Sequence, residues 1–232
     1  VTNDPPVNTV PGAQTVGEDA TLAFTGGATI RVADADNNVS SATLTIGNGS
    51  LNVTAGGATV TGNGTGTVTI SGTQVQINSA LATLDYRPTA DYNGAATLTV
   101  VSNDGTASDT DTVAITVTPV ADVVNDNLTT GEDTAVTANV LTGSGGGSAD
   151  NFEGSASITA VGTPTNGTVS FTAGGQVIYT PNADYNGADS FTYTVTSGGT
   201  TETGTVNITV TPVTDVVNDS LTTGEDTAIT AN

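Results

Sequence analysis

The chain has 232 residues, a formal net charge of −21 and a sequence pI near 4.1. Its only basic residues are Arg31 and Arg87, so it lacks the cationic groups that bind nucleic-acid phosphates or anionic membrane surfaces. Histidine and cysteine are absent, which removes the usual general bases, thiol nucleophiles and disulfides. We therefore expect no nucleic-acid partner, no direct membrane insertion and no enzymatic activity.

Short runs of alternating apolar and polar residues occur along the whole chain and predict β-strands. In the first half we expect strands at 21–24, 29–32, 42–46, 51–54, 67–70, 74–77, 96–101 and 112–120. In the second half we expect them at 135–140, 156–161, 167–171, 176–179, 190–195 and 205–213. A helix is indicated only as a single turn over Ser79–Leu84, with Asn78 as its cap. The pattern predicts an all-β fold of tandem antiparallel Greek-key β-sandwiches.

A long stretch of sequence occurs twice, 93 residues apart. Asp122–Asn139 returns as Asp215–Asn232 with two substitutions, and ADYNGA recurs at the same distance, at Ala90–Ala95 and Ala183–Ala188. A period of this size fits one small β domain and is too long for a solenoid repeat. We predict one sandwich over residues 1–121, a second over 122–214 and the truncated start of a third over 215–232.

Each ADYNGA motif lies just before the penultimate strand of its predicted domain. We expect the tyrosine rings of Tyr92 and Tyr185 to pack while their hydroxyl groups bond to the backbone, as in a tyrosine corner. The glycines that follow suit a turn with positive φ. The aspartates of the motifs, Asp91 and Asp184, are interpreted as turn formers.

The acidic residues gather at the predicted ends of the domains. They form three groups: Asp4, Asp34, Asp36 and Asp104; Glu18, Asp122, Asp126, Asp150 and Glu153; and Glu132, Asp215 and Asp219. The loops of a sandwich place the first group at one end, where crowded carboxylates repel one another unless a cation lies between them. Hard oxygen ligands at short spacing suit Ca²⁺. The alternative is that these aspartates form solvated turns.

Several of these motifs resemble a known family. VADADNNVSSATLTI (32–46) and VVSNDGTASDTDTVAITVTPVADVVND (100–126) are similar to the calcium-binding segments of a cadherin repeat. NDNLTTGEDTAVTANVL (125–141) and YTPNADYNGADSFTYTV (179–195) resemble the cadherin-like tandem repeats of large bacterial surface proteins and RTX-type adhesins.

The resemblance implies calcium between consecutive domains. It assigns Glu18, Asp122, Asp126 and the carbonyl of Asn125 to the lower half of the first junction. The loop expected to complete that junction from the second domain reads Ser197-Gly198-Gly199 and has no aspartate, so that Asp150 and Glu153 are its only substitutes.

The sequence therefore favours calcium-stabilised extender repeats of a secreted bacterial surface adhesin, a rigid spacer in cell adhesion or biofilm formation. Its partners would be the neighbouring repeats of the same chain, and any surface ligand would be bound by other domains. Two alternatives stay open. A loop or face of a sandwich could bind carbohydrate or protein, or the segment Asp215–Asn232 could pair with another chain in a self-assembling fibre.

Overall fold

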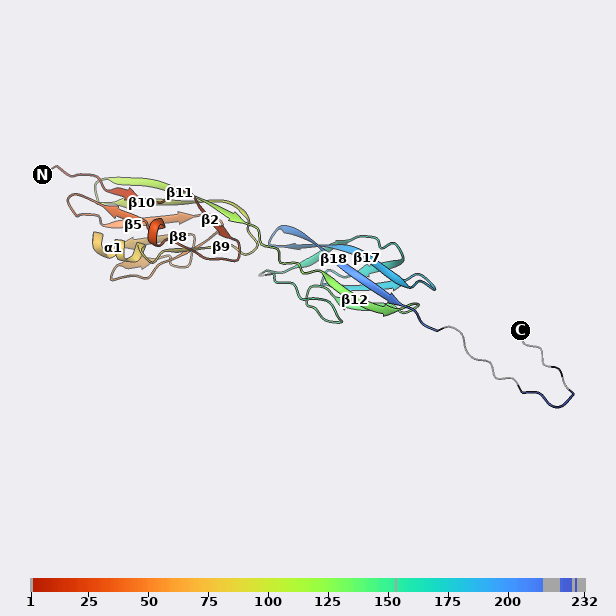
Figure 1. Ribbon diagram of the computed structural model, residues 1–232. Helices are drawn as coiled ribbons and strands as arrows, with labels where there is room; N and C mark the ends of the chain where they lie inside the picture. Colours follow the sequence, from red (N-terminus) through yellow and green to blue (C-terminus); the bar gives the residue numbers. More distant parts are fainter. Residues whose placement is uncertain (1, 153, 215–221, 227, 229–232) are drawn as a thin grey trace.

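The computed structural model describes residues 2–152, 154–214, 222–226 and 228, and it consists of two β-sandwiches that follow one another along the chain (Figure 1). One hydrophobic core is formed by buried residues between Val16 and Val117, and a separate one by buried residues between Leu128 and Val210. We call the part from β1 to β11 domain one and the part from β12 to β18 domain two. The predicted boundary at residues 121 and 122 falls in the linker between them.

Domain one is built from three sheets. The largest has the strand order β2-β11-β10-β5-β8-β7, a second has the order β3-β9-β6, and β1 pairs with β4. The elements are β1 (Val7–Thr9), β2 (Gln14–Gly17), β3 (Leu22–Ala23), the 3-10 turn η1 (Gly26–Ala28), β4 (Arg31–Ala33), β5 (Ser41–Ile46), β6 (Gly49–Asn52), β7 (Thr59–Thr61), β8 (Thr67–Ser71), α1 (Gln74–Leu81), β9 (Asp85–Pro88), β10 (Gly94–Asn103) and β11 (Ser108–Thr118).

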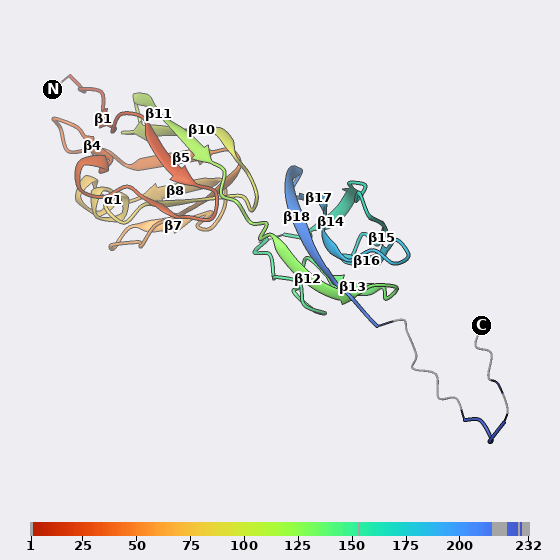
Figure 2. The ribbon, with the colours of Figure 1, turned by 45° about the vertical axis from the view of Figure 1, so that its right-hand side comes forward.

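Domain two is a smaller sandwich of two sheets, which Figure 2 shows as two layers. One has the order β12-β18-β17-β14 and the other the order β13-β16-β15. The strands are β12 (Asp126–Gly131), β13 (Val136–Asn139), β14 (Ser157–Val161), β15 (Gly167–Phe171), β16 (Gln176–Pro181), β17 (Gly187–Ser197) and β18 (Thr200–Thr211). β17 and β18 form a long hairpin whose turn points back toward domain one (Figure 2).

In the larger sheet of each domain, the strand that comes first along the chain pairs in parallel with the strand that comes last, which differs from the antiparallel prediction. β2 lies parallel to β11, and β12 lies parallel to β18. Two parallel strands start at the same end of a sheet, so the chain enters each domain at one end and leaves it at the other. This topology places the linker between the two domains and makes the molecule long (Figure 1).

The helix is longer than the sequence indicates, and it replaces a predicted strand. The strand predicted at residues 74–77 is wrong: these residues form the first turn of α1, because Thr73 and Gln76 make a capping box. The buried residues Ile77, Ala80 and Leu81 then form the apolar face of the helix. Asn78 is not a cap: its side chain accepts from the backbone N–H of Val32 and donates to the carbonyl of Val32.

Both tyrosines of the repeated motif behave as predicted. The hydroxyl of Tyr92 donates to the carbonyl of Ala95 at 2.6 Å, and that of Tyr185 donates to the carbonyl of Ala188 at 2.6 Å. The glycines after them have φ values of 137° and 135°. The motif therefore forms the same rigid turn at the same end of both domains. None of the helices in the described part of the chain is long and apolar enough to cross a membrane.

Candidate metal centre at the domain junction

The linker between β11 and β12 is held by a carboxylate from each domain. On the side of domain one, Glu18 Oε1 accepts from the backbone N–H of Val120 at 2.7 Å. On the side of domain two, the carboxylate of Glu202 on β18 accepts from the backbone N–H of Asp122, at 3.1 Å to Oε2, and of Val123, at 3.1 Å. Both acidic side chains therefore fix the path of the linker through its main chain.

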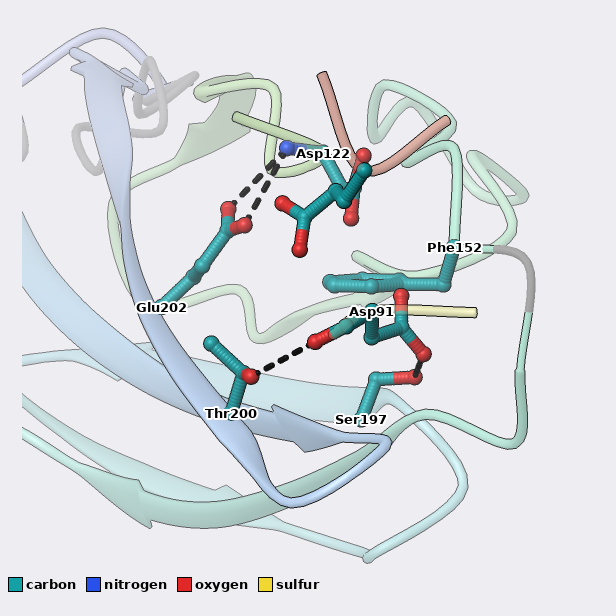
Figure 3. A pocket seen from close by; sticks show the side chains of 7 residues that line it. Asp91, Asp122, Phe152, Ser197, Thr200 and Glu202 are labelled. Carbon is teal, nitrogen blue, oxygen red and sulfur yellow. Dashed lines mark hydrogen bonds between the residues drawn. The ribbon is translucent and has the colours of Figure 1, made fainter. Parts of the chain in front are cut away.

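A direct contact between the domains is centred on Asp91, in the turn before β10. Ser197 at the end of β17 donates its hydroxyl to Asp91 Oδ2 at 2.7 Å, and Thr200 donates its hydroxyl to the Asp91 carbonyl at 2.8 Å (Figure 3). Asp91 is 3% exposed and has a φ of 55°. The aspartate is thus a turn former, as predicted, and it also joins the two domains.

Glycine at position 198 allows the hairpin of domain two to pack closely on this turn of domain one. A Cβ atom on Gly198 would lie 2.5 Å from Asp91 Cβ, and its φ is +54°. Real Cβ atoms do not approach this closely, so the turn of domain one can pack on this hairpin only where a side chain is missing. The turn at Asp91 and the Ser197–Thr200 hairpin are therefore complementary in shape and in hydrogen bonding.

A small cavity lies beside this contact, where the linker passes between the domains. Its volume is about 10 Å³, which is close to the minimum for one water molecule, so it fits a single small ion and no organic ligand. The lining residues come from both domains: Glu18, Asp91, Asp122, Phe152, Ser197, Thr200 and Glu202. Figure 3 shows the ring of Phe152 between Asp122 on one side and Asp91, with its hairpin partners Ser197 and Thr200, on the other.

Two carboxylate oxygens at this cavity are buried without a hydrogen-bond partner. They are Glu18 Oε2 and Asp91 Oδ1, on side chains that are 4% and 3% exposed. Asp122, which is 3% exposed, adds a further carboxylate. A buried carboxylate that lacks a donor or a counter-charge is strongly destabilising. The donor set, all oxygen and mostly anionic, fits a hard divalent cation such as Ca²⁺.

A second pair of carboxylates lies on the domain-two side of the linker. Asp126 is fully buried; its Oδ1 accepts from the Ser148 N–H at 2.6 Å. Asp150 is half-buried, and its Oδ1 accepts from the Val124 N–H at 2.8 Å. The Oδ2 atoms of both aspartates are buried, and the hydroxyl of Tyr193 is the side-chain donor beside the two carboxylates.

The surroundings of Asp126 and Asp150 raise the pKa of both carboxyl groups. Burial raises the pKa of Asp126. Burial and the negative charges of Asp126 and Glu202 together raise the pKa of Asp150 to about 6. The pKa of the neighbouring Tyr193 hydroxyl is raised as well, first by burial and then by Asp126 and Asp150. Crowded acids of one sign raise one another's pKa in this way when no cation neutralises them.

Asn125 and Glu153 complete the residues predicted for this junction. The carbonyl of Asn125, the predicted ligand, accepts from the Ser148 hydroxyl at 3.2 Å. The side chain of Asn125 accepts from the Thr205 N–H at 2.9 Å. Asn125 therefore anchors the linker on domain two. Glu153 lies outside the described residues.

The structure also brings together the four acidic residues predicted at the N-terminal end of domain one. Asn3 donates to Asp104 at 2.8 Å, the Asp4 N–H donates to Asp36 at 3.0 Å, and the Asp36 N–H donates to Asp34 at 2.7 Å. Hydrogen bonds from the Ala107 N–H, the Asn3 side chain and the Thr106 N–H lower the pKa of Asp104. The carboxylates of Asp34, Asp36 and Asp104 each accept at least one hydrogen bond, so the geometry fits the solvated-turn alternative as well as a cation.

The far end of domain two repeats the arrangement at Glu18. Glu132 donates its N–H to the Thr211 carbonyl at 2.9 Å, and its Oε1 accepts from the Val213 N–H at 2.6 Å. The remaining oxygen, Oε2, accepts from Asn186 at 3.2 Å. The predicted ligands Asp215 and Asp219 lie outside the described residues.

The sequence does not predict that Asp91 and Glu202 lie at the junction. The motif around Asp91 indicates only a turn former, and Glu202 stands in a strand without any acidic motif. In the part of the chain that the structure describes, no group of three or more acidic side chains is placed so that it could hold a metal ion as it stands. The junction carboxylates line a common cavity, but a cation would have to draw their side chains together.

The fold is a tandem of Ig-like β-sandwich domains. Residues 116–209, which span the linker and most of domain two, match the model of the family described as bacterial Ig domain. Bacterial Ig-like domains of this kind are typical of surface and secreted proteins. A comparison with curated proteins finds no match.

Solved structures with several domains are similar to the chain. An endo-fucoidan hydrolase of glycoside hydrolase family 107 shares 22% identity with a TM-score of 0.31, over 90% of this chain and 29% of the hydrolase. The titin domains Z1Z2 in complex with telethonin share 11% identity with a TM-score of 0.31, over 92% of this chain and 100% of theirs. Drosophila N-cadherin EC1-4 shares 15% identity with a TM-score of 0.26, over 90% of this chain and 50% of its own. The chain thus spans under a third of the hydrolase.

A methyl group at position 198 should separate the domains without unfolding them. Gly198→Ala places a Cβ against Asp91, so we expect faster cleavage of the linker in limited proteolysis and a broader distribution of dimensions in solution scattering. The matched control is Gly199→Ala, since Gly199 also has a positive φ, of 92°, but a Cβ added there would meet no atom within 4 Å. Equal cleavage rates in the two variants would contradict the contact.

Asp150 should make the metal-free chain less stable as the pH rises. Its folded pKa of about 6 lies above the unfolded value of about 3.9, so the folded state binds the extra proton between these values. The stability that this group contributes is present below about pH 4 and is lost as the pH rises through about 6. In buffer freed of divalent cations, the Tm of Asp150→Asn should fall less between pH 4 and 6 than that of the unmodified chain. Asp111→Asn, which changes the same charge in domain one, should follow the unmodified chain; a variant Asp150→Asn with an unchanged slope would refute the assignment.

Proposed function

We propose that the chain is a calcium-stiffened spacer segment of a bacterial surface protein. The observation that carries this proposal is the pair of buried carboxylate oxygens, Glu18 Oε2 and Asp91 Oδ1, that line an ion-sized cavity between two domains. The family match of domain two supports a place in a surface or secreted protein. The role as an adhesin extender, in cell adhesion or biofilm formation, belongs to this proposal.

Calcium would be held by oxygen atoms from both domains and from the linker. Glu18 and Asp91 contribute from domain one, and Asp122 contributes from the linker. Asp126 and Asp150 would hold a second ion on the side of domain two, because their buried Oδ2 atoms bring two like charges close together. When bound, the ion supplies positive charge that this chain lacks. Extracellular calcium modules bind at Kd values of ~10⁻⁴–10⁻³ M, so environmental calcium would control the stiffness.

The residues around the ion already limit the movement of the linker. Glu18 and Glu202 bind successive main-chain N–H groups of the linker, and Ser197 binds Asp91 across the junction. A cation among these carboxylates would remove their mutual repulsion and lock an arrangement that the hydrogen bonds have prepared. The partners of the chain in this proposal are the neighbouring domains, and no step of it requires catalysis.

Calcium should raise both the Tm and the rigidity of the chain, and the effect should depend on Glu18. Millimolar calcium is about a tenfold excess over a Kd of ~10⁻⁴ M, and at that excess binding stabilises the folded state by about 1.4 kcal/mol. We expect solution scattering to give a larger and more uniform maximum dimension with calcium than with chelator. Glu18→Gln keeps the acceptor for Val120 but loses the charge, so its response to calcium should be at least halved.

The matched control is Asp19→Asn, because Asp19 is the exposed neighbour of Glu18 and carries the same charge. Its calcium response should equal that of the unmodified chain. Isothermal titration calorimetry of all three chains gives the number of ions bound. If neither Tm nor dimensions change with millimolar calcium, or if the two variants respond equally, the proposed junction site is wrong.

A further inference from the structure

The turn that contacts domain two at the junction has an equivalent at the far end of domain two. Asp91 and Asp184 have the same flanking sequence and φ values of 55° and 56°. The tyrosine that follows each of them donates to a backbone carbonyl at 2.6 Å in both domains. The two turns therefore have the same shape and offer the same carboxylate. They differ in one respect: Asp91 is buried by domain two, whereas Asp184 is exposed.

The hairpin that covers Asp91 shows what such a turn binds. It offers a hydroxyl donor to the side chain from Ser197, a second hydroxyl donor to the carbonyl from Thr200, and a bare backbone at Gly198. The Ser197 hydroxyl binds the carboxylate of Asp91, and the Thr200 hydroxyl binds its carbonyl. The missing side chain at Gly198 leaves room for Asp91 Cβ.

The corresponding hairpin of domain one lacks this complementarity. β10 and β11 have the same register as β17 and β18 with an offset of 93 residues, since Gly94 faces Val117 and Gly187 faces Val210. Asp104 therefore stands where domain two has Ser197. A hairpin with an aspartate at this position would set a carboxylate against a carboxylate, which is repulsive without a cation.

We propose that the turn Asp184–Gly187 is a docking surface for the Ser197–Thr200 hairpin of a second copy of domain two. The sequence supports this occupant, because the chain after Thr214 repeats the start of domain two, Asp122–Asn139, with only two substitutions. The hydrogen-bonding contact itself needs no calcium, so this inference does not rest on the proposed function.

Site-directed crosslinking tests the docking, and the chain is well suited to it because it has no native cysteine. The full chain is extended by inserting a second copy of residues 122–214 after Thr214. One variant carries Asp184→Cys in the first copy of domain two and Ser197→Cys in the second copy. A calibration variant carries Asp91→Cys and Ser197→Cys at the observed junction, and a background variant pairs Asp184→Cys with Thr172→Cys of the second copy.

We expect the test pair to crosslink within about twofold of the yield of the calibration pair, in buffer without divalent cations, and the background pair to stay at least tenfold lower. A yield at background, while the calibration pair reacts, would overturn the proposal. A crosslink that forms only with calcium would overturn it too, since the contact would then depend on the ion. Asn186→Cys, calibrated by Asn93→Cys, repeats the test with a second position in each turn in case Asp184→Cys disturbs the fold.

Discussion

The rest of this molecule depends on one constraint: carboxylate groups are buried where the linker passes between the domains. Parallel pairing of β2 with β11 and of β12 with β18 brings the chain in at one end of each domain and out at the other. The ends of the domains must therefore meet around the linker. There Glu18 and Glu202 bind its main chain, and Glu18 and Asp91 keep oxygens that have no donor. With −21 net charge and two arginines in the chain, a dissolved cation is the natural source of the missing positive charge.

Two kinds of interaction thus act at one junction, and they have different roles. The contact of Asp91 with Ser197 and Thr200 is a set of ordinary hydrogen bonds that fixes which surfaces meet. The carboxylates around the cavity repel one another, so their contribution depends on what lies between them. In the proposed spacer, the hydrogen-bonded contact would keep the arrangement of the domains, while the stiffness would follow the cation concentration. At the N-terminal end of domain one, Asp104 occupies the position equivalent to Ser197.

Much of the fold follows from the sequence, because period-two alternation and turn residues are local signals. The long strands β10, β11, β17 and β18 and the tyrosine hydroxyl bonds are as predicted. The first turn of α1 resembles a strand in sequence, since residues 74–77 alternate apolar and polar side chains while the capping box that decides their conformation begins one residue earlier. Glu18 and Asp122, which the sequence predicts at this junction, both line the junction cavity. The sequence could not predict that Asp91 and Glu202 lie at the junction. They stand 111 residues apart, in a turn and a strand that become neighbours only when two folded domains meet.

The most direct test of a cation at this junction is anomalous scattering from crystals grown with calcium and then exchanged with a lanthanide ion. We expect a peak bounded by the carboxylates of Glu18, Asp91 and Asp122, with a second peak between Asp126 and Asp150. Clear density for these side chains without an anomalous peak among them, in crystals that bind the ion elsewhere, would contradict a cation-held junction.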